Sequence, residues 1–473
     1  MDLTKEFSLK GKWWIPYNGE DKDKDENSLY GELSYSLQSG IKLQVYGSFK
    51  GSKNTFTAQH NFLIPHLRGL TQQGECVTIM NAFGHEIGSD HLLETTLTPD
   101  YIVHNPVYYF DPESVKFDQT YIHLNCNESF FSRLYKRLEI EQFDKEGDVE
   151  KLQHIKTLPK NIYQDDSIES FLFFSYGFRY SSPGENEFMF SQKVFINSVL
   201  KEPKNFEECI RFAKVIKSIF VFFTEQKIYF NRLRFKEQNT QEIFDVIFHQ
   251  PNRKNFQNLR MMDMLCQYDD FDGSFETLFG WFIRNRNFVE EGLSLYLQLR
   301  ELKIESIPQQ FLSIVFALET LHTSFFSEPP FAKEEYQEFK RQKATFQIDH
   351  KFKKRLSECL SHFNTQSFAD RINSLIDKNN NLISEYIYDN SDFVLKIKNQ
   401  RNFFAHNHTG SSTKLIKQED FGYFIQMCKL IYDVNFLKLA GVETSAIKKT
   451  IKASFFNKYF KNKMFSSLNI SNR

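Results

Sequence analysis

The residues best suited to chemistry lie in one short stretch near the C-terminal end of the chain, at 393–410 (FVLKIKNQRNFFAHNHTG). Arg401 and Asn402 are adjacent there, and His406 follows five residues after the arginine. Histidine titrates near neutral pH and can accept or donate a proton. Arginine keeps its charge and binds phosphate oxygens through a planar fork of N–H groups. These residue types therefore suit proton transfer at a phosphodiester, with a cation to stabilise the charge on the phosphate.

The spacing of the arginine and the histidine raises a geometric problem. Apolar residues recur at helical spacing before the motif, which predicts a helix that ends near Arg401, and residues 408–410 break the pattern. Five residues correspond to about 140° around an ideal helix, so Arg401 and His406 would not share a face. The two side chains can meet only if the helix loosens near Ala405, or if a second copy of the chain supplies the missing group.

The motif lies within a long helical region. From about residue 285 the sequence consists of amphipathic segments joined by short polar loops, which predicts a helical bundle at 286–445. Pro308 suits the first turn of a helix, and Pro329 and Pro330 suit a helix end. The expected helices span 288–302, 309–326, 349–363, 368–388, the segment that enters Arg401, and a stretch from about residue 419.

The first part of the chain has a different periodicity. Apolar and polar residues alternate at 7–17, 29–37 and 41–49, and shorter strand-like runs follow at 76–80 and 121–124. This predicts a β-rich domain at 1–145, with a mostly antiparallel sheet or partial barrel. One of Trp13 and Trp14 is expected in the core of this domain, and the other on a partner-binding surface.

The middle region, at 146–285, combines strand-like runs at 171–180 and 229–235 with a helical pattern at 206–223. It is either a separate middle domain or a continuation of the first sheet. The fold class expected for the whole chain is therefore α+β, with a β-rich N-terminal domain, a mixed middle region and an all-α C-terminal bundle.

Composition limits the function classes. The 473 residues have a net charge of −1, with 41% hydrophobic and 25% charged residues, so the protein is no polycation and nucleic acid must bind to a local patch. No secretory leader and no membrane-spanning run is visible, which predicts a cytoplasmic protein without a membrane partner. Six cysteines without a CxxC pair indicate reduced thiols, and no motif predicts a metal site or a cofactor.

The end of the chain, at 446–473, is basic. No Asp or Glu follows Glu443, and apolar residues recur at spacing four, which predicts a basic amphipathic helix. Its lysines, beginning with Lys448, Lys449 and Lys452, either bind RNA or are the solvated face of a final helix that docks on the bundle.

Two resemblances, at opposite ends of the chain, point to one family. Arg401, Asn402 and His406, preceded by Ala405, resemble the motif of the HEPN superfamily of helical bundles, whose ribonuclease members carry Arg-polar-x3-His. His408 fits a broader spacing, but the RNxxAH form favours His406. The N-terminal stretches FSLKGKWWIPYN, LYGELSYSL and IKLQVYGSF resemble the N-terminal domain of ApeA-type anti-phage proteins, which end in a HEPN domain.

The resemblance implies a defence protein that cleaves RNA, such as tRNA or mRNA, and is toxic to its host when active. It implies cleavage without a metal ion or a cofactor, and 2′,3′-cyclic phosphate ends. It also implies a homodimer, or a higher even oligomer, in which two motifs face one cleft. HEPN bundles often carry an acidic residue in an early helix, so Glu319 either supports Arg401 or simply faces solvent. The N-terminal and middle regions would restrain the nuclease until a phage component binds.

Two alternatives remain open at this stage. The bundle could be a non-catalytic binding or dimerisation module in a defence or toxin–antitoxin complex, as in superfamily members that have lost the motif. A strict requirement for added metal would instead favour a nucleotide-processing enzyme.

Overall fold

The computed structural model describes residues 2–16, 27–49, 61–89, 92–112, 114–131, 160–180, 188–224, 226–251, 266–271, 273–301, 304, 306–345, 349–361, 364–384, 386–387, 389–406 and 415–453. Some residues in these ranges, including His406 and Lys452, are described by their backbone alone. The chain divides into two compact units, Met1–Asp269 and Asp270–Arg473, and each is described by itself.

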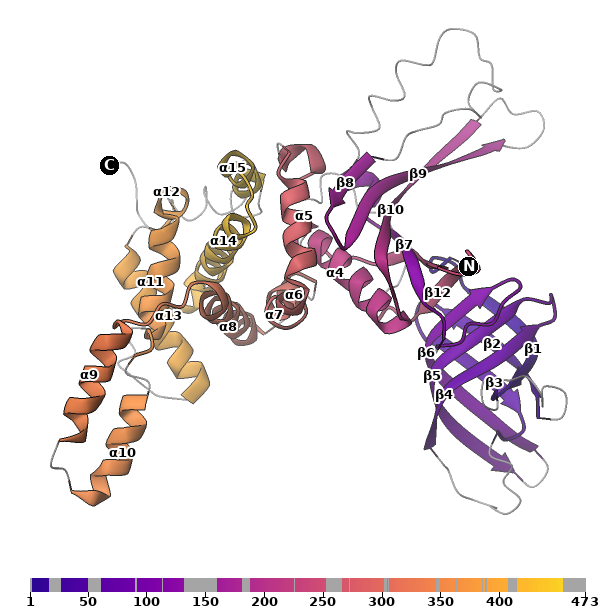
Figure 1. The fold of residues 1–473 in the computed structure, drawn as a ribbon, viewed down its shortest axis with the longest axis horizontal. Coiled ribbons are helices and arrows are strands. Elements are labelled where there is room, and N and C mark those ends of the chain that lie inside the picture. Colours follow the sequence, from indigo (N-terminus) through magenta and orange to yellow (C-terminus); the bar gives the residue numbers. More distant parts are fainter. Residues whose placement is uncertain are drawn as a thin grey trace, which may run out of the picture. The chain divides into compact units, whose positions relative to one another are not determined.

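The first unit is built on one twelve-stranded sheet (Figure 1). All pairings among its described strands are antiparallel. The strands are β1 (Phe7–Trp14), β2 (Leu29–Ser36), β3 (Gly40–Tyr46), β4 (Asn61–Thr71), β5 (Cys76–Ser89), β6 (Leu92–Asn105), β7 (Phe117–Leu124), β8 (Lys160–Gln164), β9 (Ile168–Tyr180), β10 (Phe188–Lys204), β11 (Phe230–Glu237) and β12 (Ile243–Phe248).

The first six strands close into a barrel, in the order β3, β2, β1, β4, β5 and β6, because β3 also pairs with β6. Closure leaves no free edge among these strands. The alternation seen in the sequence matches this arrangement, since one face of each strand points into the barrel and the other points to solvent.

Both tryptophans of β1 belong to the core. Trp13 and Trp14 are 0% and 1% exposed, so the expectation that one of them lines a partner-binding surface was wrong. A side chain at Gly69 on β4 would place its Cβ 2.1 Å from the Trp13 ring, so the indole needs a glycine there. The Trp13 indole Nε1 also donates to the Gly31 carbonyl at 3.3 Å. Close packing of this kind explains why neither indole reaches the surface.

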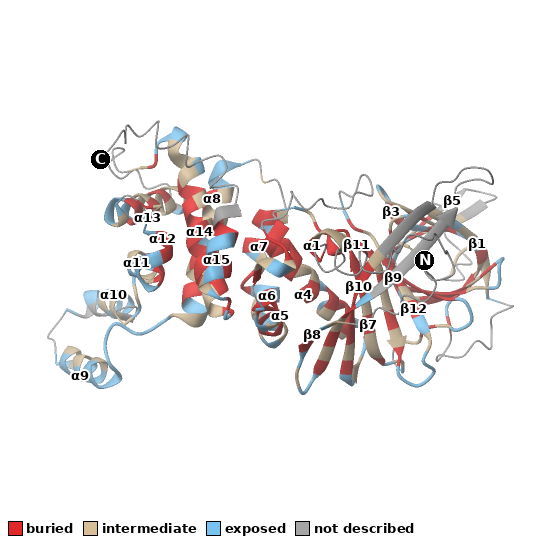
Figure 2. Cartoon of the chain, turned by 90° about the horizontal axis from the view of Figure 1, so that it is seen from above, coloured by how far each residue is buried: buried red, intermediate tan, exposed pale blue. Residues whose placement is uncertain are grey.

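The middle region continues the first sheet. Residues 94–97 of β6 pair with β3 in the barrel, whereas residues 101–104 pair with β12, which leads to β11, β7, β10, β9 and β8. The expected boundary near residue 145 therefore does not separate two sheets. Helix α4 (Phe206–Thr224) packs against β7, and a short helix, α1 (Asn127–Phe130), follows that strand. Figure 2 shows that the strands and helices of this region carry many buried residues. Phenylalanine rings, which are abundant in the sequence, fill this core, among them Phe110, Phe117, Phe206, Phe235 and Phe244.

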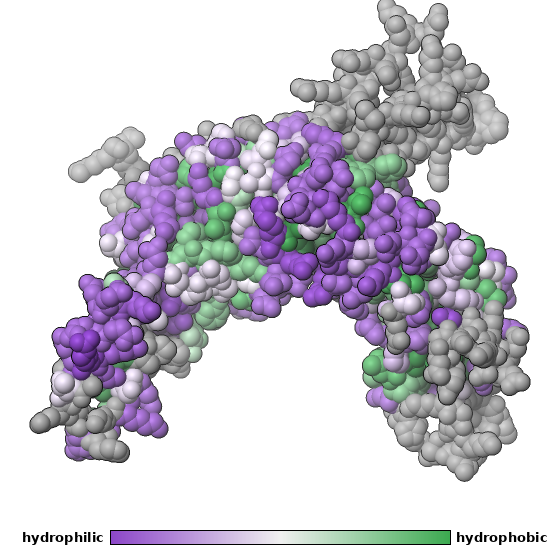
Figure 3. All heavy atoms as spheres, in the orientation of Figure 1, coloured by the Kyte–Doolittle hydropathy of each residue, from purple (hydrophilic) through white to green (hydrophobic). Residues whose placement is uncertain are grey.

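The second unit is all-helical in its described residues. Gly292 separates α6 and α7, which were expected as one helix. Two helices were not expected from the sequence, α5 and α9. None of the α9 residues whose side chains are described is buried, and the surface of the helix is hydrophilic (Figure 3). The helices are α5 (Phe275–Arg284), α6 (Arg286–Glu291), α7 (Ser294–Glu301), α8 (Ile307–Phe325), α9 (Lys333–Ala344), α10 (His350–Ser361), α11 (Phe368–Lys378), α12 (Asn380–Ile383), α13 (Asn390–His406), α14 (Phe421–Leu439) and α15 (Thr444–Ala453).

Helix α8 is central to this unit because it packs against α7, α11, α13 and α14. Pro308 lies in its first turn, as expected, where its missing N–H costs nothing. Its buried residues recur at helical spacing and include Phe311, Ile314, Val315, Leu318 and Leu321. The helix thereby brings α11 and α13 to neighbouring faces, which is the arrangement that builds the candidate site.

Candidate functional site

Helix α13 carries the Arg401–His406 motif. The sequence pattern predicted that this helix ends near Arg401, but it continues beyond that residue. It remains α-helical through Ala405 to His406. The Phe404 ring stacks on Phe421 of α14 at 5.9 Å between centroids, which gives the last turn an apolar contact. Earlier in the helix the buried face includes Phe393, Val394 and Ile397. The motif is thus anchored by packing on both sides of the arginine.

The Arg401 guanidinium lies among side chains from α8, α11 and its own helix. Its Cζ is 5.9 Å from the Phe316 ring centroid and 5.8 Å from that of Phe368, a cation–π arrangement. Nη2 lies 3.4 Å from Oε2 of Glu319, and Nη1 donates to Oδ1 of Asn402 at 3.3 Å. Nε is buried and donates to no atom of the described residues. The guanidinium is therefore held in place, and its buried Nε–H has no acceptor among the described residues.

Glu319 makes the contact that a supporting role for Arg401 requires. Its side chain is only 17% exposed on α8, and its second oxygen, Oε1, lies 3.7 Å from Nη1 of Arg371 on α11. Asn402 accepts a hydrogen bond from Arg401 through its Oδ1. The motif residues Arg401 and Asn402 thus act on one another within a small polar cluster.

The structure places His406 only by its backbone, as the last residue of α13. Because the helix is regular between the two residues, Arg401 and His406 are separated by about 140° around its axis. The loosening near Ala405 that would let them meet within one chain is not present. His408 lies outside the described residues.

Two residues of this cluster carried no recognisable sequence signal. Arg371 approaches Glu319 from α11, and its Nε donates to the Gln366 carbonyl at 3.1 Å. His322 follows Glu319 by one turn of α8; it is fully buried, and neither ring nitrogen has a hydrogen-bond partner among the described residues. Burial lowers the pKa of His322, and the positive charges of Arg371 and Lys378 lower it further. Neither residue belongs to a sequence motif within its own helix, so only the tertiary structure relates Arg371 and His322 to Arg401.

The lysines of the C-terminal segment are not part of this cluster. Lys448 and Lys449 are exposed on α15, whose main helix contact is with α14, while Ile447 and Ile451 of the same helix are buried. The Lys452 side chain and the segment after Ala453 lie outside the described residues. The described part of the helix fits either role, solvated face or RNA contact.

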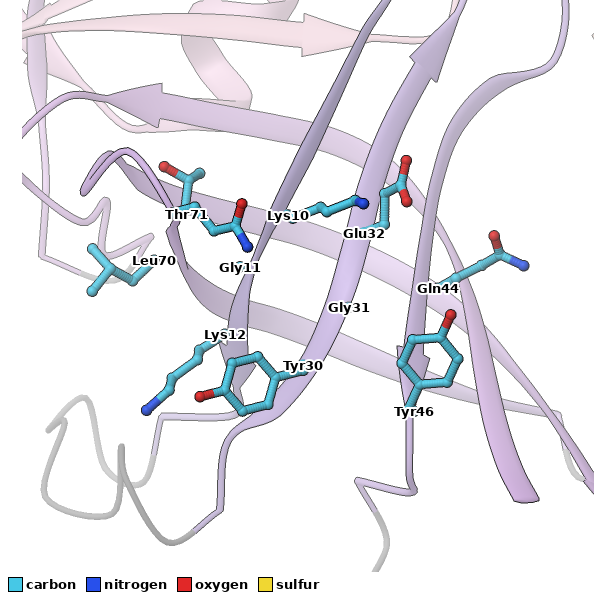
Figure 4. A pocket seen from close by; sticks show the side chains of 11 residues that line it. Lys10, Gly11, Lys12, Tyr30, Gly31, Glu32, Gln44, Tyr46, Leu70 and Thr71 are labelled. Atoms are coloured by element: carbon cyan, nitrogen blue, oxygen red, sulfur yellow. The ribbon is translucent and has the colours of Figure 1, made fainter. Parts of the chain in front are cut away.

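The first unit has a groove on the outer face of its barrel, with a volume of about 480 Å³. Figure 4 shows the rings of Tyr30 and Tyr46 on the neighbouring strands β2 and β3, and both tyrosines are more than 60% exposed. Lys12 lies beside them on β1, with its Nζ 5.5 Å from the Tyr30 ring centroid. Lys10 pairs in register with Glu32 on the adjacent strand. This polar, aromatic surface is accessible to a ligand.

The described part of the chain also bears on metal binding, membrane insertion and thiol chemistry. No group of three or more His, Cys, Asp or Glu side chains there is arranged to hold a metal ion. None of the described helices has the length and hydrophobicity needed to span a membrane. The thiols of the cysteines whose side chains are described are buried, at Cys76, Cys126, Cys209, Cys266 and Cys428.

Comparisons with known proteins match both ends of the chain. The model for ApeA N-terminal domain 1 matches residues 8–281, more than half of the sequence, and so includes the middle region that sequence reasoning left unassigned. The model for Apea-like HEPN matches residues 312–446, which include Glu319, Arg371, Arg401, Asn402 and His406. No curated protein and no solved structure matches the chain. The chain therefore belongs to the ApeA family, with ApeA N-terminal domain 1 followed by an Apea-like HEPN domain.

Proposed function

We propose that the protein is an anti-phage endoribonuclease whose HEPN domain cleaves RNA without a metal ion. The observation that carries this proposal is the Arg401 side chain, which is oriented by Glu319 and Asn402 and keeps a buried N–H unpartnered among the described residues. A pre-oriented arginine with a spare donor suits the binding of a phosphate oxygen. Arg401 lies within the residues that match the Apea-like HEPN family, and it belongs to the same motif as His406.

The proposed reaction is transesterification. His406 accepts the proton of the RNA 2′-OH, the O2′–P bond forms, and the P–O5′ bond breaks as the 5′ oxygen takes up a proton. The products are a 2′,3′-cyclic phosphate and a 5′-OH. Arg401 contributes by stabilising the negative charge that builds up on the non-bridging oxygens. Asn402 contributes by holding the guanidinium through the hydrogen bond to Nη1.

The active unit is proposed to be a homodimer. In one chain a regular helix directs Arg401 and His406 to faces about 140° apart. A two-fold symmetric dimer can place Arg401 of one subunit opposite His406 of the other. The symmetry then gives two equivalent arginine–histidine pairs in each dimer. The helical geometry thus supports a site completed by the second subunit.

Regulation is proposed to come from the N-terminal unit, because a ribonuclease that damages its host must be restrained until infection. The barrel groove beside Tyr30 and Tyr46 is the accessible surface on which a phage component would act. Once the nuclease is released from this restraint, it cleaves host or phage RNA. Phage production then stops by abortive infection.

The direct test uses purified wild-type protein, Arg401→Ala and His406→Ala with single-stranded RNA and tRNA in EDTA. Wild type is expected to cut and to leave 2′,3′-cyclic phosphate ends, and each variant should be slower by about a hundredfold or more. Arg341→Ala is a matched control, because that arginine is 78% exposed on α9 and its Nη1 lies 3.0 Å from Oε2 of Glu338, one turn away on the same helix. Equal RNA integrity with wild type and His406→Ala, in vitro and after induction in cells, would sink the proposal.

A non-catalytic module is the second candidate. The ion pair between Glu319 and Arg401 is also compatible with this candidate, because a purely structural arginine would form the same contact. This candidate predicts a protein that dimerises or binds a defence or toxin–antitoxin partner and leaves RNA intact. The cleavage assay in EDTA separates the two, and cutting that occurs only with added metal would contradict both.

A further inference from the structure

One carboxylate in the helical unit bridges two arginines from different helices. Glu319 of α8 lies 3.4 Å from Nη2 of Arg401 on α13 through Oε2, and 3.7 Å from Nη1 of Arg371 on α11 through Oε1. All three side chains are partly buried, with exposures of 17%, 26% and 23% for Glu319, Arg401 and Arg371. The contacts therefore join three helices that are far apart in sequence at a single point.

The charges of this group do not cancel. Both arginines keep their charge at any accessible pH, and one carboxylate neutralises only one of them, so the group retains one positive charge. The surroundings are consistent with a positive local potential, because Arg371 and Lys378 both lower the pKa of the buried His322 after the larger effect of its burial. A partly buried positive charge is screened by salt less than an exposed one. One bound phosphodiester would supply the matching negative charge.

The donors of the two arginines are also incompletely used. Nε of Arg401 is buried and has no acceptor among the described residues. Arg371 is fixed by its Nε bond to the Gln366 carbonyl at 3.1 Å and by the Nη1 contact with Glu319, and no described residue accepts from its Nη2. The orientation of both guanidinium groups is thus set by the protein, and each has an N–H group left over for a ligand.

We propose that Arg371 is a second phosphate-binding residue of the ribonuclease site, and that Glu319 spaces Arg371 and Arg401 so that both bind the scissile phosphodiester of single-stranded RNA. The inference rests on the proposed ribonuclease function and extends it to a residue outside the motif. Two arginines suit the reaction better than one, because the phosphate gains negative charge as the 2′ oxygen attacks. The exposed Phe316 ring, which contacts the Arg401 guanidinium, is positioned to stack on a base next to that phosphate.

The test measures binding and cleavage separately. Binding of a fluorescent single-stranded RNA is measured between 50 and 200 mM salt (roughly the range over which phosphate contacts weaken) in a His406→Ala background, so that the RNA stays intact. Arg371→Ala is expected to reduce the slope of log affinity against log salt by about 0.7, the value for one lost contact to a single strand. Arg371→Lys should retain most of the slope, because lysine keeps the charge, and Arg341→Ala should match the background protein.

Cleavage by the same Arg371 variants with His406 intact supplies the second readout. Both Arg371→Ala and Arg371→Lys are expected to lower kcat by about tenfold or more, because lysine cannot reproduce the planar fork. Thermal melting identifies a variant that fails to fold; in that case Arg371→Lys decides the matter alone, and a normal kcat would overturn the inference.

The outcomes separate this inference from the proposed function. If wild type cleaves RNA, and Arg371→Ala changes neither the salt slope nor kcat, the arginine is a structural bridge between α8 and α11 and the inference is overturned. If wild type does not cleave RNA, the ribonuclease proposal fails, and the salt slope in the binding assay still decides whether Arg371 contacts a phosphate. A reduced slope with Arg371→Ala and a preserved slope with Arg371→Lys supports the inference.

Discussion

Glu319 and Arg401 are 82 residues apart in sequence, and their side chains meet at 3.4 Å between Oε2 and Nη2. A carboxylate in this position does more than neutralise charge. It accepts hydrogen bonds only from directions that its two oxygens allow, so it restricts the plane of the guanidinium. The rings of Phe316 and Phe368 restrict the same group by their contacts with Cζ. The orientation of Arg401 therefore depends on a residue in a different helix.

Replacement of Glu319 by glutamine tests this dependence. Glutamine keeps the shape and one acceptor but loses the charge that attracts the guanidinium, so Arg401 should become less well oriented. We expect kcat for RNA cleavage to fall by about tenfold to a hundredfold. RNA affinity should be unchanged or higher, because the cluster becomes more positive. Separate measurement of kcat and KM checks both expectations.

Glu338→Gln is the matched control, because Glu338 forms an exposed ion pair with Arg341 on α9. It should leave both kinetic constants unchanged. Cleavage by Glu319→Gln at the wild-type rate would show that the ion pair does not position the arginine.

Mixed dimers test whether the active site is shared between subunits. If Arg401 of one subunit acts with His406 of the other, an Arg401→Ala subunit and a His406→Ala subunit form one dimer with one intact site. An equal mixture of the two inactive variants should then recover about a quarter of the wild-type activity, since half of the dimers are mixed. The mixture is denatured and refolded together, or co-expressed with two tags, and its cleavage rate is measured.

The double variant carrying both substitutions, mixed with wild type, is the control for subunit exchange. If the site is shared, a dimer of one wild-type and one double-variant subunit contains no site that has both Arg401 and His406. No recovery from the two single variants, when exchange has been demonstrated, would rule out a site made of one arginine and one histidine in trans.

Local periodicity predicted most elements of the fold but not their long-range pairing. The strands β1, β2 and β3 and the helix α4 were visible because alternation and helical spacing are local properties. Closure of the barrel depends on the pairing of β3 with β6, which no local pattern encodes. Helix α9 was missed because it has no apolar face that is buried. Helix α5 was missed although Phe275, Leu278, Phe279 and Phe282 recur at helical spacing, because the helix is short and contains Gly280.

The candidate site was predictable where its residues are neighbours in sequence or match a feature of the HEPN family. Arg401, Asn402 and His406 were recognised from their spacing, and Glu319 from its position in an apolar helix. Arg371 offers no such signal, because a charged residue on an amphipathic helix is most often solvated. Its relation to Arg401 is created by the packing of α11 and α13 on the same helix, α8.

The barrel groove makes the proposed sensing role testable. Tyr30 and Tyr46 are 64% and 66% exposed, so their replacement by serine should cost less than about 0.5 kcal/mol of stability. We expect the double variant to keep its RNA cleavage activity when purified but to lose protection against phage in cells. Plaque counts on cells that express each form measure this difference.

Ser34→Ala is the matched control, because it changes an accessible position on the same barrel face. Tyr296→Phe would not serve, because the Tyr296 ring is buried. Ser34→Ala should protect cells as wild type does. Full protection by the double tyrosine variant would exclude the groove as the sensing surface.

The buried His322 predicts a pH dependence of local stability. Burial, followed by the charges of Arg371 and Lys378, lowers the pKa of this histidine in the folded protein, whereas the unfolded chain has the ordinary value near 6.5. As the pH falls below about 6.5, the unfolded state binds a proton that the folded state does not, so the free energy of unfolding decreases. The slope from this one group is at most about 1.4 kcal/mol per pH unit, and it ends at the folded-state pKa.

His322→Leu should flatten this acid limb, because leucine has a similar volume and no proton to bind. It should also be at least as stable as wild type near neutral pH, since it removes two ring nitrogens without partners among the described residues. Hydrogen exchange of α8 peptides at pH 5.5 and 7.5 (on either side of roughly the unfolded-state pKa), corrected for intrinsic rates, measures both effects. His104 also has a pKa lowered by burial, but it lies in the other unit, so His104→Leu should leave the exchange of α8 unchanged. The same acid sensitivity of α8 in wild type and His322→Leu would mean that another group titrates there, and that the buried histidine does not limit the stability of the helix that holds Glu319.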